Sequence, residues 1–236
     1  VCALDNINFT IEEKEFVSIL GPSGCGKSTA MYLISGLETP TTGEVFFHGK
    51  KVKGAGRERM VVFQEYALLP WRTTLANVTL GLEGRYPNPK EIASKYLELV
   101  GLRGFENSYP HQLSGGMKQR VSLARSLAVN PEVLLMDEPF ASVDAQTREA
   151  LQNELLSIWE VEKKTVLFVT HSIEEAIYLS QRIIIMTPRP GRVKAELQVP
   201  ESYPRSYEFR TSKSVQELRH NIHELLYSSE MGREIS

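Results

Sequence analysis

The stretch "FVSILGPSGCGKST", residues 16–29, decides the fold of this chain. Its first five residues form a short apolar run of the kind found in a buried strand. The residues that follow match G-x-x-x-x-G-K-[ST], and a helical segment, AMYLISGL, comes directly after them. A strand, a glycine-rich loop and a helix in this order predict a phosphate-binding loop in an α/β fold.

The residue types of this loop suit the binding of phosphate groups. Its glycines let backbone N–H groups turn toward phosphate oxygens, and the helix that begins beyond Gly26 adds the positive end of its dipole. Lys27 supplies a compact cation for the terminal phosphates, and Ser28 offers a hydroxyl group to Mg²⁺. The expected cofactor-binding residues are Gly21, Pro22, Ser23, Gly24, Cys25, Gly26, Lys27, Ser28 and Thr29. The alternative is a glycine-rich turn that contains Lys-Ser by chance, and the flanking strand and helix argue against it.

Beyond the loop, apolar runs typical of buried strands recur along the chain. They lie at residues 60–63 (MVVF), 133–139 (VLLMDEP), 165–170 (TVLFVT) and 182–186 (RIIIM). Residues 4–11 alternate as a half-buried strand does, and "GEVFFHGKKV", residues 43–52, is typical of edge β-structure. From Trp71 to about Asn130 the strand signal is missing and two segments are helical in period. The economical interpretation is a parallel sheet with an antiparallel β edge and an inserted α-helical subdomain.

The bulk composition is that of an ordinary globular protein. The chain has 236 residues, of which 42% are hydrophobic and 24% charged, and its formal net charge is −2. This balance gives no electrostatic footprint for nucleic acid, and no apolar run approaches the roughly 20 residues needed to cross a bilayer. Cys2 and Cys25 form no disulfide framework, which predicts a reducing cytosol. Because the sequence starts at Val1 inside a strand pattern, we expect a short N-terminal stretch to be missing.

Two carboxylates end the apolar run at residues 133–139. A buried parallel strand delivers its last residues to the carboxyl edge of the sheet, where ligands bind. Asp137 is expected to hold Mg²⁺ through its water shell, and Glu138 to polarise the attacking water beside the terminal phosphate. Solvated acids at a strand end are the alternative, which the upstream phosphate loop makes the weaker one.

Gln64 and His171 each follow a predicted strand in the same way. A neutral amide can bind Mg²⁺ or water without adding charge, and an imidazole can contact the terminal phosphate or its water. Taken alone, each residue is better explained as a structural polar cap. Four strand ends that carry a phosphate loop, a Gln, an Asp-Glu pair and a His together favour a catalytic site.

A second glycine pair opens the segment "LSGGMKQRVSLARSL", residues 113–127. Two adjacent glycines before a long helical pattern suit the binding of an anion at a helix N-terminus. As an isolated triplet, Ser114-Gly115-Gly116 is better explained as a helix N-cap followed by flexible glycines. A chain that already has a phosphate loop does not by itself explain a second helix start of this kind.

In order and approximate spacing, these motifs resemble those of the ATP-binding cassette (ABC) family over about residues 4–190. The matches are Lys27 and Ser28 in the phosphate loop, Gln64 in the glutamine loop, Ser114-Gly115-Gly116 in the signature, Asp137 and Glu138 in the acidic strand, Asp144 of "ASVD" in the aspartate loop, and His171 as the switch histidine. The resemblance implies a P-loop NTPase core of the RecA-like type, with ATP and Mg²⁺ as cofactors. It implies Glu138, His171 and Gln64 as catalytic residues, and Ser28, Gln64 and Asp137 as the residues that hold Mg²⁺.

The resemblance also explains the second glycine pair. In this family two copies pack head to tail, and the signature of one copy closes over the ATP in the phosphate loop of the other. Ser114, Gly115, Gly116 and Asp144 are therefore expected to bind nucleotide in trans. The chain departs from the family in two places. The aspartate loop reads ASVD where SALD is common, and no aromatic residue precedes Phe9 to stack on adenine, so that residue is expected in the missing N-terminal stretch.

The segment "QEYALLPWRTTLANV", residues 64–78, contains an apolar cluster at Leu68, Leu69, Pro70 and Trp71. In the family this stretch lies at the surface that receives short helices from membrane-spanning subunits, and its composition suits a partner. The alternative is a cluster folded against its own helical insert. The stretch YALLPW within this segment and "MTPRPGRV", residues 186–193, together resemble the subgroup that serves nitrate, sulfonate, taurine and bicarbonate uptake in bacteria.

Residues 191–236 form a predicted C-terminal extension with a strand, VKAELQV, and an amphipathic helix. The helix has Val215, Leu218, Ile222 and Leu225 on one face, which marks a stripe buried against another surface. Packing on its own domain or on a like subunit is the simpler interpretation, and a ligand-sensing or regulatory tail is the alternative. His220 and His223 lie three apart on this helix, where exposed structural histidines are favoured over a metal site.

The sequence therefore predicts an ABC ATPase domain over residues 1–190, in which 1–70 and 131–190 form the nucleotide-binding core and 71–130 the helical subdomain. The expected function is an ATP-hydrolysing subunit that powers a bacterial importer as a peripheral protein on the cytoplasmic face of the inner membrane. Its expected partners are a second copy of the ATPase subunit, permease subunits that dock around Leu68–Trp71 and, indirectly, a periplasmic or surface substrate-binding protein. No nucleic-acid partner is expected. One alternative is a soluble ABC ATPase that acts on nucleic acid or ribosomes. Another is a P-loop kinase, which would leave Ser114-Gly115-Gly116 unexplained.

Overall fold

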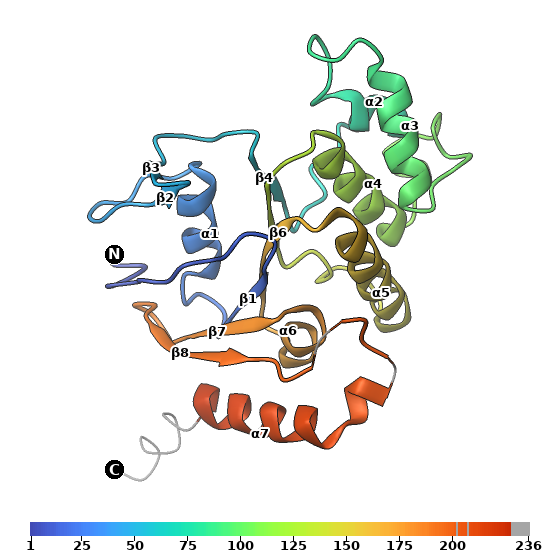
Figure 1. Ribbon diagram of the computed structural model, residues 1–236. Coiled ribbons are helices and arrows are strands. Elements are labelled where there is room, and N and C mark those ends of the chain that lie inside the picture. Colours follow the sequence, from blue (N-terminus) through green and yellow to red (C-terminus); the bar gives the residue numbers. More distant parts are fainter. Residues whose placement is uncertain (202, 207, 228–236) are drawn as a thin grey trace. The chain divides into compact units, whose positions relative to one another are not determined.

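The structure is a computed structural model that describes residues 1–201, 203–206 and 208–227 (Figure 1). The chain divides into two compact units. Unit 1 contains Val1–Ala55 and Lys163–Ser236, and unit 2 contains Gly56–Glu162. In the described ranges, no helix combines the length and the apolar composition that crossing a membrane requires.

Unit 1 contains a sheet with the strand order β6-β1-β7-β8. Its strands are β1 (Phe16–Leu20), β6 (Thr165–Thr170), β7 (Arg182–Met186) and β8 (Val193–Gln198). β1 pairs in parallel with β6 and β7, whereas β8 pairs antiparallel with β7. The first three strands are buried along their whole length, and β8 alternates between half-buried and exposed residues. This difference is the one expected between central parallel strands and an edge strand with one solvated face.

The helices of unit 1 follow the phosphate loop, the predicted His171 position and the C-terminal strand. They are α1 (Lys27–Ser35), α6 (Ile173–Leu179) and α7 (Lys213–Tyr227), with a short 3₁₀ helix, η2, at Glu208–Thr211. α1 ends at Gly36, which adopts the left-handed conformation that closes many helices. Figure 1 shows α7 running beside α6 and below β7 and β8, and α7 packs against both α6 and β7.

Unit 2 combines one strand pair with most of the helices. β4 (Arg59–Val62) pairs in parallel with β5 (Val133–Asp137), with Val62 opposite Met136. The helical elements are α2 (Thr74–Thr79), α3 (Pro89–Leu99), the 3₁₀ helix η1 (Pro110–Gln112), α4 (Gly115–Ala128) and α5 (Ala145–Glu162). α2, α3 and α4 pack against one another. Residues 71–130 therefore form a helical region, as the missing strand signal predicts.

The predicted α/β class with parallel strands is confirmed, but one local prediction is wrong. Residues 4–11 do not form a strand: Leu4 makes a single bridge to Gly191, and Asn6 adopts a left-handed φ of 49°, which interrupts an extended segment. The predicted β-structure at residues 43–52 is present as a short antiparallel hairpin of β2 (Phe46–Phe47) and β3 (Lys50–Lys51). At residues 4–11 the alternation of residue types is present, but among the described residues only the bridge of Leu4 to Gly191 pairs with it.

The C-terminal strand and amphipathic helix are both present. The stripe on α7 has Val215 and Ile222 buried and Leu218 and Leu225 half-buried. Because α7 packs on α6 and β7 of its own unit, the structure shows that the stripe packs on its own domain. On the outer side of α7, His220 lies 3.4 Å from Glu224, and the His223 ring packs against Tyr227.

Candidate functional site

The phosphate loop follows β1 in unit 1, and its backbone needs glycine at Gly26. This residue is the N-cap of α1 and has a φ of 104°, where a residue with a Cβ atom is strained. A Cβ atom there would also lie 2.5 Å from Cδ2 of Leu4. Gly24 has a φ of 76° as well. The loop thus has the tight backbone that the sequence motif predicts.

Lys27 is the first residue of α1, and its side chain is only 5% exposed. Its Nζ donates to the carbonyl oxygens of Gly21, at 2.9 Å, and Pro22, at 3.1 Å. The ammonium group therefore lies inside the loop. The N-cap residue of α1, Gly26, makes no side-chain hydrogen bond to the helix, and the positive end of the helix dipole lies at the phosphate loop. These features fit the phosphates of a nucleotide.

Cys25 is a buried loop residue whose thiol lies beside this cation. Burial raises the pKa of the Cys25 thiol, and this effect outweighs the opposing charge of Lys27. The thiol therefore stays protonated at neutral pH and is a poor nucleophile. Cys25 thus contributes packing and backbone to the phosphate loop.

His171 follows β6 and is exposed. Because β1 and β6 are parallel and Leu20 pairs with Thr170, the phosphate loop and His171 leave the same edge of the sheet from adjacent strands. Thr170 Oγ1 donates to Glu175 Oε2 at 2.6 Å and accepts from the Ser172 N–H at 3.0 Å. These two hydrogen bonds bracket His171. The structure therefore brings together the two parts of the predicted site that lie in unit 1.

In unit 2, Asp137 is the last residue of β5 and is 5% exposed. Glu138 follows it with a φ of 42°, a left-handed conformation that costs a non-glycine residue about 1–2 kcal/mol. Such strain is concentrated at functional sites, where the surrounding structure enforces it. Gln64 lies two residues beyond β4 and is exposed. Since β4 and β5 are paired and parallel, Gln64 and the two carboxylates leave the same edge of unit 2.

The signature segment, Ser114-Gly115-Gly116, has an N-cap at Ser114 and a packing reason for the glycine at position 116. Ser114 is exposed and is the N-cap of α4, and its Oγ accepts from the Met117 N–H at 3.3 Å. The N-cap is therefore present. A Cβ atom on Gly116 would lie 2.8 Å from Cγ2 of Thr147, so that position has room only for glycine. The α4 N-terminus, with Ser114 exposed and Gly116 buried, thus lies beside the N-terminal turn of α5.

The loops of unit 2 are connected by Tyr66 and Arg125, which the motifs do not single out, and by Ser142 of the aspartate loop. The hydroxyl groups of Tyr66 and Ser142 lie 2.8 Å apart. Arg125 of α4 donates to the carbonyl oxygens of Ala67, at 2.6 Å, and Tyr66, at 3.0 Å. These contacts join the residues after Gln64 to the signature helix and to the aspartate loop. No signal in the sequence indicates them, because the partners are far apart along the chain.

Asp144 is an exposed residue of the aspartate loop in unit 2. Its Oδ1 accepts from the Thr147 N–H at 3.0 Å, and this hydrogen bond lowers the pKa of the Asp144 carboxyl group. The carboxylate is therefore ionised and oriented by the first turn of α5. An oriented, exposed carboxylate is available to a second molecule.

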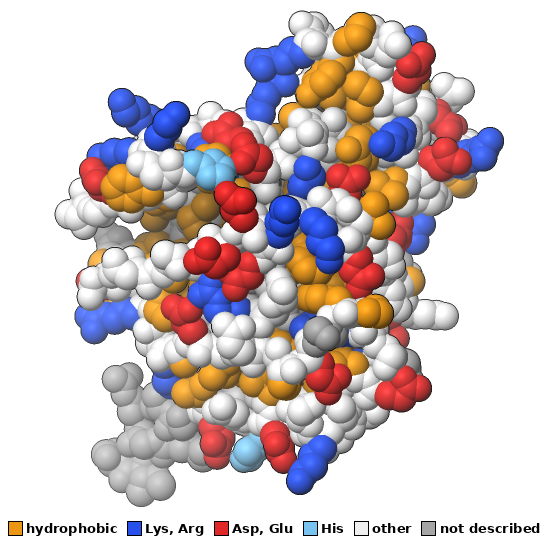
Figure 2. All heavy atoms as spheres, in the orientation of Figure 1, with side chains coloured by type: hydrophobic (Ala, Val, Ile, Leu, Met, Phe, Trp, Pro, Cys, Tyr) orange, Lys and Arg blue, Asp and Glu red, His pale blue; other side chains and the backbone are white. Residues whose placement is uncertain are grey.

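The apolar cluster at residues 68–71 is held by Asn77, which is fully buried. Asn77 Oδ1 accepts from the Leu69 N–H at 2.8 Å, and its Nδ2 donates to the carbonyl oxygens of Leu69, Arg72 and Thr73. Leu68 and Leu69 are half-buried, whereas Trp71 is 72% exposed. Figure 2 shows hydrophobic side chains at the surface over the helices of unit 2. Leu68 and Leu69 therefore fold partly against the helical region, whereas Trp71 is exposed, and docking of a partner at this cluster stays a prediction.

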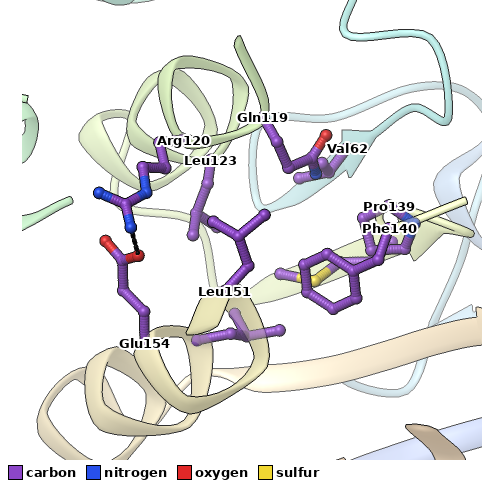
Figure 3. Close-up of a pocket in the computed structure, with 10 residues that line it drawn as sticks. Val62, Gln119, Arg120, Leu123, Pro139, Phe140, Leu151 and Glu154 are labelled. Atoms are coloured by element: carbon purple, nitrogen blue, oxygen red, sulfur yellow. Dashed lines mark ion pairs between the residues drawn. The ribbon is translucent and has the colours of Figure 1, made fainter. Parts of the chain in front are cut away.

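A small pocket lies between α4 and α5 beside the end of β5 (Figure 3). Its lining is largely apolar, with Leu123, Phe140 and Leu151 among the residues that face it. At its edge the Arg120 guanidinium lies 2.9 Å from the Glu154 carboxylate, which joins the two helices. This pocket belongs to the packing of α4 on α5, and its lining is unsuited to phosphate.

The two units hold different parts of the predicted site. Unit 1 contains the phosphate loop, with Lys27 and Ser28, and His171, whereas unit 2 contains the remaining predicted site residues, Gln64, Asp137, Glu138, Ser114, Gly115, Gly116 and Asp144. Contacts of Ser28 with Asp137 or Gln64, and of Glu138 with a nucleotide in the phosphate loop, stay predictions.

Comparison with known proteins gives one family. A family model described as "ABC transporter" matches residues 4–141. An uncharacterized ABC transporter ATP-binding protein of Methanocaldococcus jannaschii, MJ0412, is 56% identical over 229 residues, which cover 96% of this chain and 85% of that protein. The aliphatic sulfonates import ATP-binding protein SsuB of Bacillus cereus is 46% identical over 222 residues, which cover 94% of this chain and 87% of that protein.

A solved structure supports the same assignment of the fold. The dimeric post-hydrolysis state of the ATP-binding cassette MJ0796, bound to ADP and Pi, is 38% identical to this chain and superimposes with a TM-score of 0.73. The match covers 85% of this chain and 92% of that structure. The parallel strands and the helical insertion of this chain are thus those of an ATP-binding cassette.

Proposed function

We propose that this chain powers an importer for a small anion or organosulfur compound. The proposal starts from the family: the chain belongs to the ABC transporter family of ATP-binding subunits. As a member of that family it binds and hydrolyses ATP. The observation that supports the importer most directly is its 46% identity, over 94% of its length, to a protein named for aliphatic sulfonate import. The candidate substrates are nitrate, sulfonates, taurine and bicarbonate, to which the segments YALLPW and MTPRPGRV also point.

In the proposed mechanism, the phosphate loop binds the β- and γ-phosphates of ATP. The N–H groups at the start of α1 donate to phosphate oxygens, and the buried Lys27 ammonium turns from the carbonyls of Gly21 and Pro22 to the terminal phosphates. Because this cation is already desolvated, its attraction to phosphate is stronger than it would be in water. The remaining loop residues, Ser23, Gly24, Cys25, Gly26 and Thr29, supply backbone or hydroxyl donors.

Mg²⁺ is the proposed second cofactor, and its role when bound is to neutralise the charge of the transferred phosphoryl group. Ser28, in the first turn of α1, Asp137, buried at the end of β5, and Gln64 would hold it. A hydroxyl, a carboxylate and an amide supply the oxygen ligands that this ion prefers. This donor set fits Mg²⁺ better than a softer metal.

Glu138 is the proposed general base, and His171 the proposed contact to the terminal phosphate or the attacking water. Glu138 is the residue directly after Asp137, which ends the buried strand β5, and its strained backbone constrains the position of its side chain. His171 leaves the strand next to the phosphate loop. Gln64 completes this set of catalytic residues by orienting water or Mg²⁺.

Two copies are proposed to form each finished site. The N-terminus of α4, with the exposed Ser114 and the glycines Gly115 and Gly116, would cap the terminal phosphate held by the other copy, and the oriented Asp144 would contact it. ATP then joins the two copies, and hydrolysis removes the contacts that hold them together. The related cassette MJ0796 was solved as a dimer, which supports this arrangement.

Permease subunits are the proposed partners at the surface around Leu68, Leu69, Pro70 and Trp71. Asn77 fixes this loop, so that the exposed Trp71 side chain is preorganised for binding. Docking there places the protein as a peripheral subunit on the cytoplasmic face of the inner membrane. A periplasmic or surface substrate-binding protein would deliver the substrate to the permease, and this chain would not contact the substrate.

The importer is tested by reconstituting this chain in liposomes with the permease encoded beside it and with its substrate-binding protein. We expect ATP-dependent uptake of one labelled anion among an alkanesulfonate, taurine, nitrate and bicarbonate, and no uptake with the Glu138→Gln variant. The competing function, action on ribosomes or nucleic acid, is disfavoured by the net charge of −2. ATPase stimulation by ribosomes or nucleic acid, without stimulation by any permease, would replace the importer with that function.

A further inference from the structure

We propose that five residues of the C-terminal extension, Tyr203, Arg205, Phe209, Arg210 and Arg219, hold α6 from its outer side and thereby position His171. This set is called the C-terminal clamp, and Arg205 is its principal positioning residue. The inference rests on the proposed role of His171 in ATP hydrolysis. It assigns to the extension a part in catalysis, exerted through α6.

Arg205 is 8% exposed, and its guanidinium group caps the C-terminal end of α6. Nη1 donates to the carbonyl oxygens of Ile177, at 2.7 Å, and Tyr178, at 2.6 Å. Nη2 donates to the carbonyl oxygen of Ser180 at 2.7 Å. The last carbonyls of a helix have no partner within the helix, and they form the negative end of its dipole. A buried cation therefore satisfies the end of α6.

Aromatic rings hold the Arg205 side chain in place. Its guanidinium carbon lies 4.4 Å from the centroid of the Tyr203 ring and 4.7 Å from that of Phe209. The Tyr203 hydroxyl donates to the carbonyl oxygen of Leu179, the last residue of α6. The Arg210 guanidinium carbon lies 3.6 Å from the ring centroid of Tyr178, which also belongs to α6. Four residues of the extension thus converge on one end of one short helix.

The other end of α6 carries the residues around His171. Ser172 is the N-cap of α6, and its Oγ accepts from the Glu175 N–H at 3.3 Å. Glu175 is buried and accepts from the hydroxyl group of Thr170, the residue before His171. Any change in the axis of α6 therefore moves Ser172 and Glu175, and with them the backbone on both sides of His171.

Arg219 of α7 adds a contact near this N-terminal end. Its guanidinium donates to the carboxylate of Glu174, in the first turn of α6. Both side chains are more than half exposed, so this ion pair contributes less than the buried contacts of Arg205. The C-terminal clamp consequently contacts α6 at both ends.

α6 needs external support because it is only seven residues long. Helices this short are not stable by themselves in water, and their order comes from tertiary contacts. His171 is exposed and lies in the connection between β6 and α6. The backbone of His171, set by β6 on one side and α6 on the other, therefore limits where the imidazole can lie.

A purely structural role of the extension predicts a different result from a positioning role. If the C-terminal clamp only covers the apolar core, its loss lowers the melting temperature and leaves the turnover number of the folded protein unchanged. If it positions His171, its loss lowers kcat while KM for ATP, which reports on the phosphate loop, stays as it is. The two roles are therefore separated by the kinetics of the folded variant.

The test compares Arg205→Met and Arg205→Lys with Lys213→Gln in the whole protein, assayed well below their melting temperatures. Lys213 is a matched control, because it is an exposed cation of α7 that pairs with Glu217 in its own helix. We expect Arg205→Met to lower kcat about 10-fold, since displacing a catalytic group by about 1 Å can cost up to 10²-fold. Arg205→Lys, which keeps the charge but not the three-carbonyl geometry, should give a smaller loss. Lys213→Gln should have no effect.

The histidine spectrum gives a readout that a structural role would not move. The protein has five histidines, and the ¹³Cε1 signal of His171 is identified by its loss in His171→Ala. We expect Arg205→Met to shift or broaden this signal and to leave those of His48 and His111 unchanged. Arg219→Gln should give a weaker change of the same kind, and it serves as the test if Arg205→Met fails to fold.

The double variant Arg205→Met/His171→Ala completes the test by single-turnover hydrolysis of labelled ATP. Positioning through His171 predicts that Arg205→Met has no further effect once the imidazole is removed, because coupled residues are not additive. Equal losses in both backgrounds, or an unshifted His171 signal with unchanged kcat, would overturn the inference and leave the role of His171 intact. Unchanged turnover in His171→Ala alone would instead refute the proposed role of His171, and the inference with it.

Discussion

The starts of α1 and α4 are both glycine-led helix N-termini, and they differ in how much of an anion site each contains. α1 begins after Gly26 in a left-handed conformation, and the buried Lys27 ammonium lies beside it. α4 begins after Ser114 in an extended conformation, and the hydroxyl of Ser114 already accepts from the Met117 N–H. The cation at the first helix start is buried within its own loop, whereas the N-cap side chain at the second is exposed.

The difference teaches that the same local feature serves two purposes in one chain. An enclosed helix start with a desolvated cation can bind phosphate without help from another molecule. A helix start with an exposed cap and no buried cation of its own contributes strongly to phosphate binding only when a second molecule brings the phosphate and excludes water. Four predictions test or refine this contrast between unit 1 and unit 2.

The largest expected effect follows from Glu138→Gln in unit 2. Loss of the proposed general base should lower kcat about 10²- to 10⁴-fold, while the amide keeps the shape of the side chain. Nucleotide affinity, which depends on the phosphate loop of unit 1, should not change, and an ATP-bound dimer should accumulate. Turnover is measured by phosphate release and the dimer by light scattering. Glu149→Gln, at an exposed position of α5, is the control. Normal turnover in Glu138→Gln would remove this residue from the mechanism.

The second prediction separates the two helix starts directly with Gly26→Ala and Gly116→Ala. Alanine at position 26 meets the strain of a φ of 104° and the Leu4 side chain, so the single chain should lose nucleotide affinity. Alanine at position 116 collides with Thr147 and should cost about 1–3 kcal/mol of stability. It should leave nucleotide binding intact and abolish the ATP-dependent dimer. Binding is measured with a fluorescent nucleotide and dimerisation by light scattering.

Gly54→Ala is the control for both glycine variants, because its Cβ atom would meet open space. It should behave as the unmodified protein does in both measurements. If Gly116→Ala weakened nucleotide binding to the isolated chain as much as Gly26→Ala does, the contrast between the two helix starts would be wrong.

The third prediction concerns the surface of unit 2 that is proposed to receive the permease. Asn77→Ala should lower the free energy of unfolding by about 2–3 kcal/mol, because it leaves buried backbone groups without partners. Trp71→Ala should change stability by less than about 0.5 kcal/mol, since the side chain is 72% exposed, and should weaken binding to the permease. Chemical denaturation and co-purification with the permease measure the two effects. Tyr86→Ala, at another exposed aromatic residue of unit 2, should alter neither.

The smallest effects are expected from one ion pair in each unit, and they have opposite dependence on pH. Burial raises the pKa of Glu15 in unit 1, but hydrogen bonds from Arg182 and from the backbone outweigh it, so the pKa lies below its ordinary value of 4.5. Its contribution to stability is therefore present above pH 4.5 and is lost as the pH falls through the lowered pKa. Glu15→Gln should remove about 1–2 kcal/mol at neutral pH and little at pH 3.

Glu154 in unit 2 has a raised pKa, because burial outweighs the attraction of Arg120. Its contribution is greatest below its ordinary pKa and is lost as the pH rises through the raised value. Glu154→Gln should therefore cost more stability at low pH than at pH 7, where we expect less than about 1 kcal/mol. Thermal denaturation between pH 3 and pH 8 measures both variants. The same pH dependence in the two variants would contradict the assignment.

How much the sequence predicts depends on whether the residues involved are neighbours along the chain. The strand, loop and helix around Gly26 were predictable because the dihedral angles and hydrogen bonds of a phosphate loop are local. The strand predicted at residues 4–11 does not form, because an alternating pattern does not show whether a partner strand is present. Asn6, with its left-handed backbone, also interrupts the extended segment. Asn77 was missed because its importance comes from four hydrogen bonds to a loop that the pattern alone does not fold.

The family, the α/β class and the candidate phosphate loop all follow from the amino-acid sequence, since short motifs and the period of apolar runs set local structure. Only the tertiary structure decided that His171 and the phosphate loop leave adjacent strands, that Tyr66 lies 2.8 Å from Ser142, and that Arg205 caps α6. These contacts join residues far apart along the chain. They exist because buried strands and helices pack in one arrangement, in which polar groups removed from water must find partners.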